Sequence, residues 1–298
     1  MDRRTFLAGL AALGACATTS NAKPLRGKSL GIQLYALGPE AQNDLDATFA
    51  ELARIGYKSV EVFSGRHTGP EFRAALDRAG LTAPSIHGAA NADMSSAIEF
   101  AHAVGARTVV APMFPFLRAM PTPQPGQGNG NPAALLAHSY TLDDWKRACD
   151  LLNSAGTQCK AAGLKFGYHN HNVEFAPLGD GIAFDAIAAN TDPALVQFEV
   201  DVGWVAAAGA DIPAFLNRHR GRVKQMHVKD LKATTQPNFE FRMDPTEVGS
   251  GMIDWPLVLN TAIAGGVEEF YVEQEPPFAQ HPPLEAARIS FQYLNTLK

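Results

Sequence analysis

The sequence predicts an α/β fold that consists of a single (β/α)8 TIM barrel. Short β-branched or apolar runs alternate with amphipathic stretches over about 270 residues, a pattern typical of parallel barrels. Polar residues follow most of the apolar runs, on the side where such a barrel carries its active site. Of the 298 residues, 46% are hydrophobic and 18% are charged, which excludes a disordered, collagen-like or coiled-coil chain.

The segment 28–298 is expected to contain all eight strands and their helices. The expected strands are residues 30–35, 59–63, 83–87, 108–111, 164–169, 196–201, 223–228 and 270–273. Helical spacing of apolar residues is clearest at 48–56, 94–104, 142–162 and 284–297. A doubly wound open sheet is the alternative, but Leu37-Gly38-Pro39 after the first strand is not a glycine-rich phosphate-binding turn.

The connection after the fourth strand is unusually long. Residues 112–140 are rich in proline and glycine and are expected to form a loop insertion without secondary structure. In a barrel this insertion emerges at the catalytic face, where it would be either a lid over the site or an insertion without a role.

The N-terminal residues have the features of an export signal. Arg3 and Arg4 precede an apolar run rich in Ala, Gly and Leu, which resembles a bacterial twin-arginine signal, so residues 1–22 are expected to be signal and tether. The stretch Leu13-Gly14-Ala15-Cys16 resembles a lipobox. These features predict a periplasmic protein, whose membrane contact would come only through a lipid anchor on Cys16.

Charge and cysteine content narrow the choice of partners. The chain has 25 Lys+Arg against 30 Asp+Glu, a net charge of −5, and a sequence pI near 6.0. Nucleic-acid-binding domains usually carry a strongly basic face, so a small molecule is the expected partner and nucleic acid is not. Three cysteines are too few for a disulfide framework. Homo-oligomerisation stays open.

Most of the expected strands end in polar or ionisable residues. Alternation along a strand directs His169 and His171 to one face, and does the same for Glu199 with Asp201 and for Glu273 with Glu275. Burying so many imidazoles and carboxylates together is costly unless a cation offsets their charge. The strand-end residues are Gln33, Tyr35, Glu61, His87, His169, His171, Glu174, Glu199, Asp201, Trp204, His227, Lys229, Glu273 and Glu275.

Several short motifs resemble one family, the xylose isomerase-like sugar phosphate isomerase/epimerase superfamily. They are Val60-Glu61, Ser85-Ile86-His87-Gly88 and the segments 168–175, 200–204, 226–230, 248–255 and 272–275. The resemblance implies one divalent metal ion, with Asp201, His227 and Glu273 matching three of the family's ligands. His169 stands where many members have the fourth ligand, a glutamate. These imidazole and carboxylate ligands suit Mn²⁺, Co²⁺, Fe²⁺ or Zn²⁺ better than Ca²⁺ or Mg²⁺.

The resemblance also implies chemistry next to a carbonyl group. The expected enzyme removes a proton alpha to the carbonyl of a ketose or keto-sugar, as an isomerase, an epimerase or a 3-keto-glycoside hydratase or lyase. The base candidates are His171, Glu174 and Glu275, and the acid or oxyanion partners are His87 and Lys229. The expected sugar-binding residues are Gln33, Tyr35, Glu61 and Trp204.

The replacement at residue 169 bears on the choice of reaction. In the epimerases the missing glutamate is one of two groups that move the proton, so His169 favours hydration or elimination over epimerisation. The segment 168–175 resembles a subgroup whose members include enzymes that hydrate or eliminate 3-keto sugars. Two alternatives from other classes are a non-catalytic sugar-binding lipoprotein and a metal-dependent endonuclease, the latter disfavoured by the acidic pI and the export signal.

Overall fold

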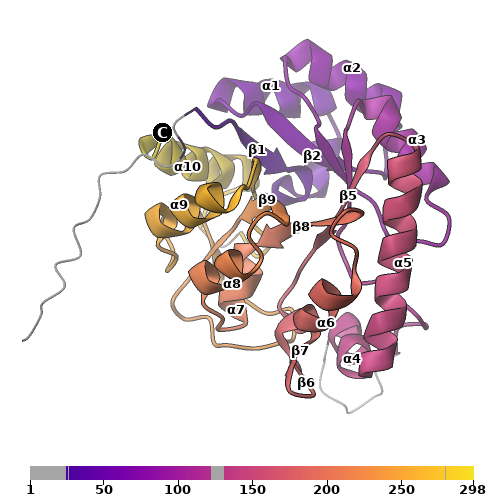
Figure 1. Cartoon of the computed structure of the whole chain (residues 1–298). Coiled ribbons are helices and arrows are strands. Elements are labelled where there is room, and N and C mark those ends of the chain that lie inside the picture. Colours follow the sequence, from indigo (N-terminus) through magenta and orange to yellow (C-terminus); the bar gives the residue numbers. More distant parts are fainter. Residues whose placement is uncertain (1–24, 26, 122–130, 279) are drawn as a thin grey trace, which may run out of the picture.

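The computed structural model describes residues 25, 27–121, 131–278 and 280–298, and it confirms the predicted fold: eight parallel strands close into one barrel with helices around it (Figure 1). Around the barrel the strands follow the order β1-β12-β9-β8-β5-β4-β3-β2. The barrel strands are β1 (Leu30–Gln33), β2 (Ser59–Phe63), β3 (Ser85–His87), β4 (Thr108–Ala111), β5 (Lys165–His169), β8 (Val196–Asp201), β9 (Val223–Val228) and β12 (Glu269–Val272).

The helices that cover the barrel begin and end close to the expected limits. Thr141 caps the longest of them with its side chain, and a glycine in the left-handed region ends α2, α3 and α9. The helices are α1 (Leu45–Ile55), α2 (Gly69–Ala79), α3 (Ser95–Val104), α4 (Pro132–His138), α5 (Leu142–Ala161), α6 (Ala183–Asn190), α7 (Val202–Ala207), α8 (Ile212–Arg218), α9 (Trp255–Gly265) and α10 (Pro283–Thr296).

The first strand is shorter than predicted, and its end changes direction. The side chain of Gln33 accepts a hydrogen bond from the backbone N–H of Tyr35, and a 3-10 helix, η1 (Leu34–Leu37), replaces the last two expected strand residues. A second 3-10 turn, η2 (Pro39–Gln42), follows. The side chain of Tyr35 is therefore 52% exposed at the mouth of the barrel instead of continuing the strand.

The long insertion is not a loop throughout its described part. Residues 132–138 form α4, whose first turn is capped by Asn131 through a hydrogen bond to the N–H of Ala133. The expectation of a connection without secondary structure is wrong for these residues. Residues 122–130 and the expected export signal, including Cys16, lie outside the described residues.

Two small hairpins stand outside the barrel, and the second supports the active-site side. β6 (Pro177–Leu178) pairs with β7 (Gly181–Ile182), and β10 (Asp230–Leu231) pairs with β11 (Pro245–Thr246). The carboxylate of Asp230 accepts hydrogen bonds from the N–H groups of Gly249 and Gly251 and from the indole N–H of Trp255. Asp230 therefore anchors the loop 249–255 instead of pairing with Lys229.

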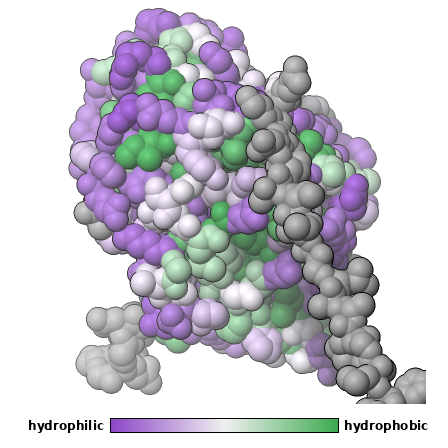
Figure 2. All heavy atoms as spheres, turned by 90° about the vertical axis from the view of Figure 1, so that its left-hand side faces the viewer, coloured by the Kyte–Doolittle hydropathy of each residue, from purple (hydrophilic) through white to green (hydrophobic). Residues whose placement is uncertain are grey.

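The outer surface is mixed in polarity. On the face in Figure 2, hydrophobic patches (green) are interrupted by hydrophilic side chains (purple). No helix within the described residues combines the length and the apolar character needed to span a membrane.

Candidate metal centre and active-site cleft

Strand register brings the polar strand ends to one level. His169 on β5 pairs with Glu199 on β8, and Asp201 pairs with His227 on β9. Because these strands are parallel neighbours, their carboxyl ends open on the same side of the barrel. The four predicted ligands, His169, Asp201, His227 and Glu273, meet there, and one ligand atom of each lies within 4.8 Å of the others.

The segment after β5 shows why these side chains face inward. Asn170, between the two histidines, points the other way and exchanges hydrogen bonds with the backbone N–H and C=O of Asp201. Asn172 holds the loop that carries Phe241 by accepting a hydrogen bond from its N–H. The asparagines thus fasten the neighbouring segments, while alternation leaves His169 and His171 facing the centre of the barrel.

A second group of donors overlaps the first. It consists of His87, Glu199 and the shared residues His169 and His227. Glu199 Oε1 lies 3.0 Å from His87 Nε2, 3.2 Å from His169 Nδ1 and 3.1 Å from His227 Nε2. One carboxylate oxygen of Glu199 therefore contacts and orients three imidazole rings. Contacts of this kind fix the ring positions of metal-binding histidines.

Gln33 and Glu61, which were predicted to bind the substrate, belong to this buried layer. Both side chains are fully buried. Glu61 Oε2 lies 2.8 Å from His227 Nε2 and 3.1 Å from His87 Nε2, and it accepts a hydrogen bond from Gln33 Nε2. These contacts place Gln33 and Glu61 against the buried imidazoles, and their predicted role in substrate binding stays a prediction.

Lys229 supplies a buried positive charge beside the predicted ligands. Its ammonium lies 2.7 Å from Asp201 Oδ2, 3.2 Å from Glu273 Oε2 and 2.7 Å from Glu275 Oε1. Burial alone would lower the pKa of Lys229, but these three carboxylates raise it well above its usual range. Lys229 is therefore charged and holds Glu273 and Glu275 in place.

The charges in the cluster are unevenly compensated. Burial would lower the pKa of His227, but Glu199 and Glu273 raise it well above normal. Burial and the neighbouring imidazoles hold the pKa of His169 well below its usual range, so its ring is neutral with a lone pair free. Burial raises the pKa of Asp201 to about 6, because Lys229 offsets only part of the cost of its charge.

The residues present fit a divalent cation. Asp201 Oδ2 is buried, and the Lys229 ammonium, 2.7 Å away, is the only described group within hydrogen-bond distance of it, so this oxygen keeps a lone pair for a metal. The same oxygen lies 3.8 Å from His169 Nε2 and 3.9 Å from His227 Nδ1. Two donors bound to one ion at 2.0–2.2 Å lie at most about 4.4 Å apart, so these spacings leave room for a metal between them.

An open cleft of about 510 Å³ lies above the cluster. Of the predicted functional residues, Tyr35, His87, His169, His171, Glu273 and Glu275 line it. The other lining residues were not among the predicted functional residues, and they are Phe63, Ser64, Gly88, Ala89, Pro112 and Met113. Their common signal is their position at the end of β2 or directly after β2, β3 and β4, where barrel loops form the active site.

Comparison with known proteins places this arrangement in a family. The xylose isomerase-like TIM barrel family matches residues 49–297. The chain belongs to this family. A curated relative, the inosose dehydratase of Lactiplantibacillus plantarum, is 34% identical over 173 residues, which cover 52% of this chain and 55% of the relative. The chain thus spans about half the length of the curated relatives it matches.

Solved structures agree with the family assignment. A sugar phosphate isomerase/epimerase from Parabacteroides distasonis superposes with a TM-score of 0.71 at 25% identity, covering 91% of this chain and 94% of the other. The 3-keto-D-glucoside 4-epimerase from E. coli superposes with a TM-score of 0.62 at 18% identity, covering 90% and 99%, and shares the fold.

Within this xylose isomerase-like barrel, two further predicted residues lie outside the cleft. Trp204 was expected to stack on the sugar, but its side chain is 1% exposed and packs behind His171 and Lys229. The helix α7 begins directly after Asp201, so strand alternation ends before Trp204 and turns it away from the cleft. In this position Trp204 packs against the His171 ring.

Glu174, a predicted base candidate, is the second such residue. It is fully buried, accepts a hydrogen bond from the Tyr168 hydroxyl, and accepts another of 2.9 Å from the N–H of His171. Burial raises its pKa to about 7, although these hydrogen bonds act in the opposite direction. Glu174 therefore fixes the backbone of His171 from behind.

Proposed function

We propose that this barrel is a divalent-metal-dependent lyase acting on a cyclic keto-polyol or keto-sugar. It removes the proton alpha to the carbonyl and expels the substituent, water or an alcohol, on the next carbon. The observation that carries the proposal is the meeting of four metal-ligating side chains from four strand ends, Asp201 among them, at the floor of a cleft that contains His87 and His171. The similarity to inosose dehydratases supports an elimination, because a dehydratase removes water.

The metal would be held by His169, Asp201, His227 and Glu273, and Mn²⁺, Co²⁺, Fe²⁺ and Zn²⁺ are the candidates. When bound, it supplies Lewis-acid polarisation of the substrate carbonyl. Glu199 and Glu61 fix the imidazole rings, and Lys229 holds Glu273 and Glu275 at the cleft wall.

The proton transfers fall to residues that line the cleft. A ring nitrogen of His171 takes the alpha proton as the C–H bond breaks and the C=C bond forms. The His171 imidazolium then gives this proton to the oxygen on the next carbon as the C–O bond breaks, which releases water or an alcohol and returns His171 to its neutral form. His87 lines the cleft, but its ring nitrogens face Glu199 and Gln33, so it fixes the cleft wall. Glu275 is the second base candidate, since it also lines the cleft and 25% of its side chain is exposed.

Isomerisation or epimerisation of a ketose is the second candidate, favoured by the similarity to the Parabacteroides sugar phosphate isomerase/epimerase. Product analysis by mass spectrometry and NMR distinguishes the two. With metal-loaded enzyme, we expect an inosose to lose one water molecule and a 3-keto-glucoside to release its alcohol with formation of an enone. A product of unchanged mass with one inverted or moved centre would instead support the second candidate and overturn the first.

A further inference from the structure

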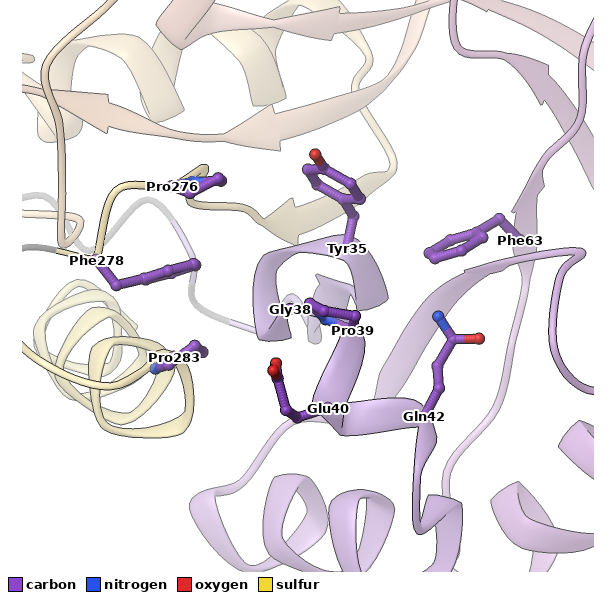
Figure 3. A pocket seen from close by; sticks show the side chains of 9 residues that line it. All are labelled: Tyr35, Gly38, Pro39, Glu40, Gln42, Phe63, Pro276, Phe278 and Pro283. Carbon is purple, nitrogen blue, oxygen red and sulfur yellow. The ribbon is translucent and has the colours of Figure 1, made fainter.

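A second cavity of about 540 Å³ adjoins the cleft, and no step of the proposed reaction uses it. Most of its walls come from the turns after β1 and from the segment that leads from β12 into α10 (Figure 3). The strands β1 and β12 are paired neighbours in the barrel, which brings these two segments together. We call this cavity the proline–aromatic groove. It is lined by Tyr35, Gly38, Pro39, Glu40, Gln42, Phe63, Pro276, Phe278 and Pro283.

The groove and the cleft are neighbouring cavities that meet at two shared side chains. Tyr35 and Phe63 line both cavities. In Figure 3, Phe278 and Pro283 lie at one end of the groove and Phe63 and Gln42 at the other. A ligand whose reacting ring occupies the cleft would therefore extend past Tyr35 into the groove. Ligand sites typically measure about 300–1,000 Å³, so each cavity alone can hold a ring-sized group.

The lining indicates what this extension would be. Three prolines and three aromatic rings form most of the walls, and Tyr35, Glu40 and Gln42 are the only lining residues with polar side-chain groups. Gln42 Oε1 is buried and accepts no hydrogen bond from any described residue, so it could accept one from a single hydroxyl group of a ligand. A second sugar ring would bury several hydroxyl groups against this wall, and each one left unpaired would weaken binding. A flat aryl group fits better, because it stacks on aromatic and proline rings.

We propose that the proline–aromatic groove binds the aryl aglycone of a glycoside whose sugar ring lies in the cleft. This inference rests on the proposed function, since it assigns the groove to the alcohol that the elimination would release. It narrows the substrate class to keto-glycosides with an aromatic aglycone.

Calorimetric titration of the full metal-loaded chain with phenyl glucoside and methyl glucoside of the same anomeric form tests the groove without any turnover. We expect the phenyl compound to bind about tenfold more tightly, as burial of a stacked ring predicts. In the Phe278→Ala variant, the Kd of the phenyl compound should rise to that of the methyl compound. Leu257→Ala, an exposed apolar residue on α9, is the matched control and should keep the preference.

Equal Kd values for the two glucosides, or an undiminished preference in Phe278→Ala, would overturn the groove assignment. Failure of the proposed function gives a different result. In that case the phenyl preference and its loss in Phe278→Ala persist, but metal-loaded enzyme forms no enone from a 3-keto-glucoside.

Discussion

The Asp201→Asn variant is expected to lose most of its bound divalent metal and at least about 100-fold in activity. Changes around metal ligands already cost 10–100-fold, and Asp201 would be a ligand itself. The amide removes the negative charge but keeps an oxygen that can cap α7 in place of Oδ1, which now accepts a hydrogen bond from the N–H of Trp204. Metal content after dialysis, measured by mass spectrometry, gives the readout.

Asp254→Asn is the matched control, because Asp254 caps α9 through the N–H of Leu257 and lies outside the cluster. It should retain the metal. If Asp201→Asn is folded by circular dichroism and still carries one metal per chain, the assignment of Asp201 as a ligand is wrong.

The second large effect concerns stability, and it comes from Glu174. Its pKa is about 7 in the folded protein, against an ordinary value of 4.5. A carboxyl group with a raised pKa contributes stability that is complete below about pH 4.5 and is lost as the pH rises to about 7. At 1.36 kcal/mol per pKa unit, the loss amounts to about 3 kcal/mol.

Glu174→Gln should remove this dependence. The amide can donate to the Tyr168 hydroxyl while its oxygen accepts from the N–H of His171, so the packing is preserved. Urea unfolding at pH 5 and pH 8 should therefore show wild type losing about 3 kcal/mol more than the variant over this range. Glu99→Gln, the same change at an exposed position on α3, controls for the substitution. If the difference in unfolding free energy between wild type and Glu174→Gln is the same at both pH values, the pKa of Glu174 is not raised.

Strand positions and inward-facing residues could be predicted because alternation and register are local rules. The period of two placed His169, Asp201, His227 and Glu273 on one face, and parallel pairing brought them together. The same rule placed Glu273 and Glu275 along the cleft.

The remaining roles depend on packing that no local pattern encodes. Glu61 lies two residues before the end of β2 and under the imidazoles, whereas His87 ends β3 and lines the cleft. Trp204 lies beyond the last strand residue, so alternation no longer determined its direction. No sequence pattern indicated a role for Phe278 either, because the groove exists only where the turns after β1 and β12 meet.

The central claim is that this barrel removes a proton alpha to a carbonyl with the help of a divalent metal. The most direct measurement is NMR detection of solvent deuterium entering an inosose or a 3-keto-glucoside in heavy water, using metal-loaded enzyme, chelator-treated enzyme and the metal-loaded His171→Asn variant. We expect deuterium at the carbon next to the carbonyl with the loaded enzyme, and exchange at least about 100-fold slower with the chelator-treated enzyme and with His171→Asn. Undiminished exchange after complete removal of the metal, or none with the loaded enzyme, would contradict it.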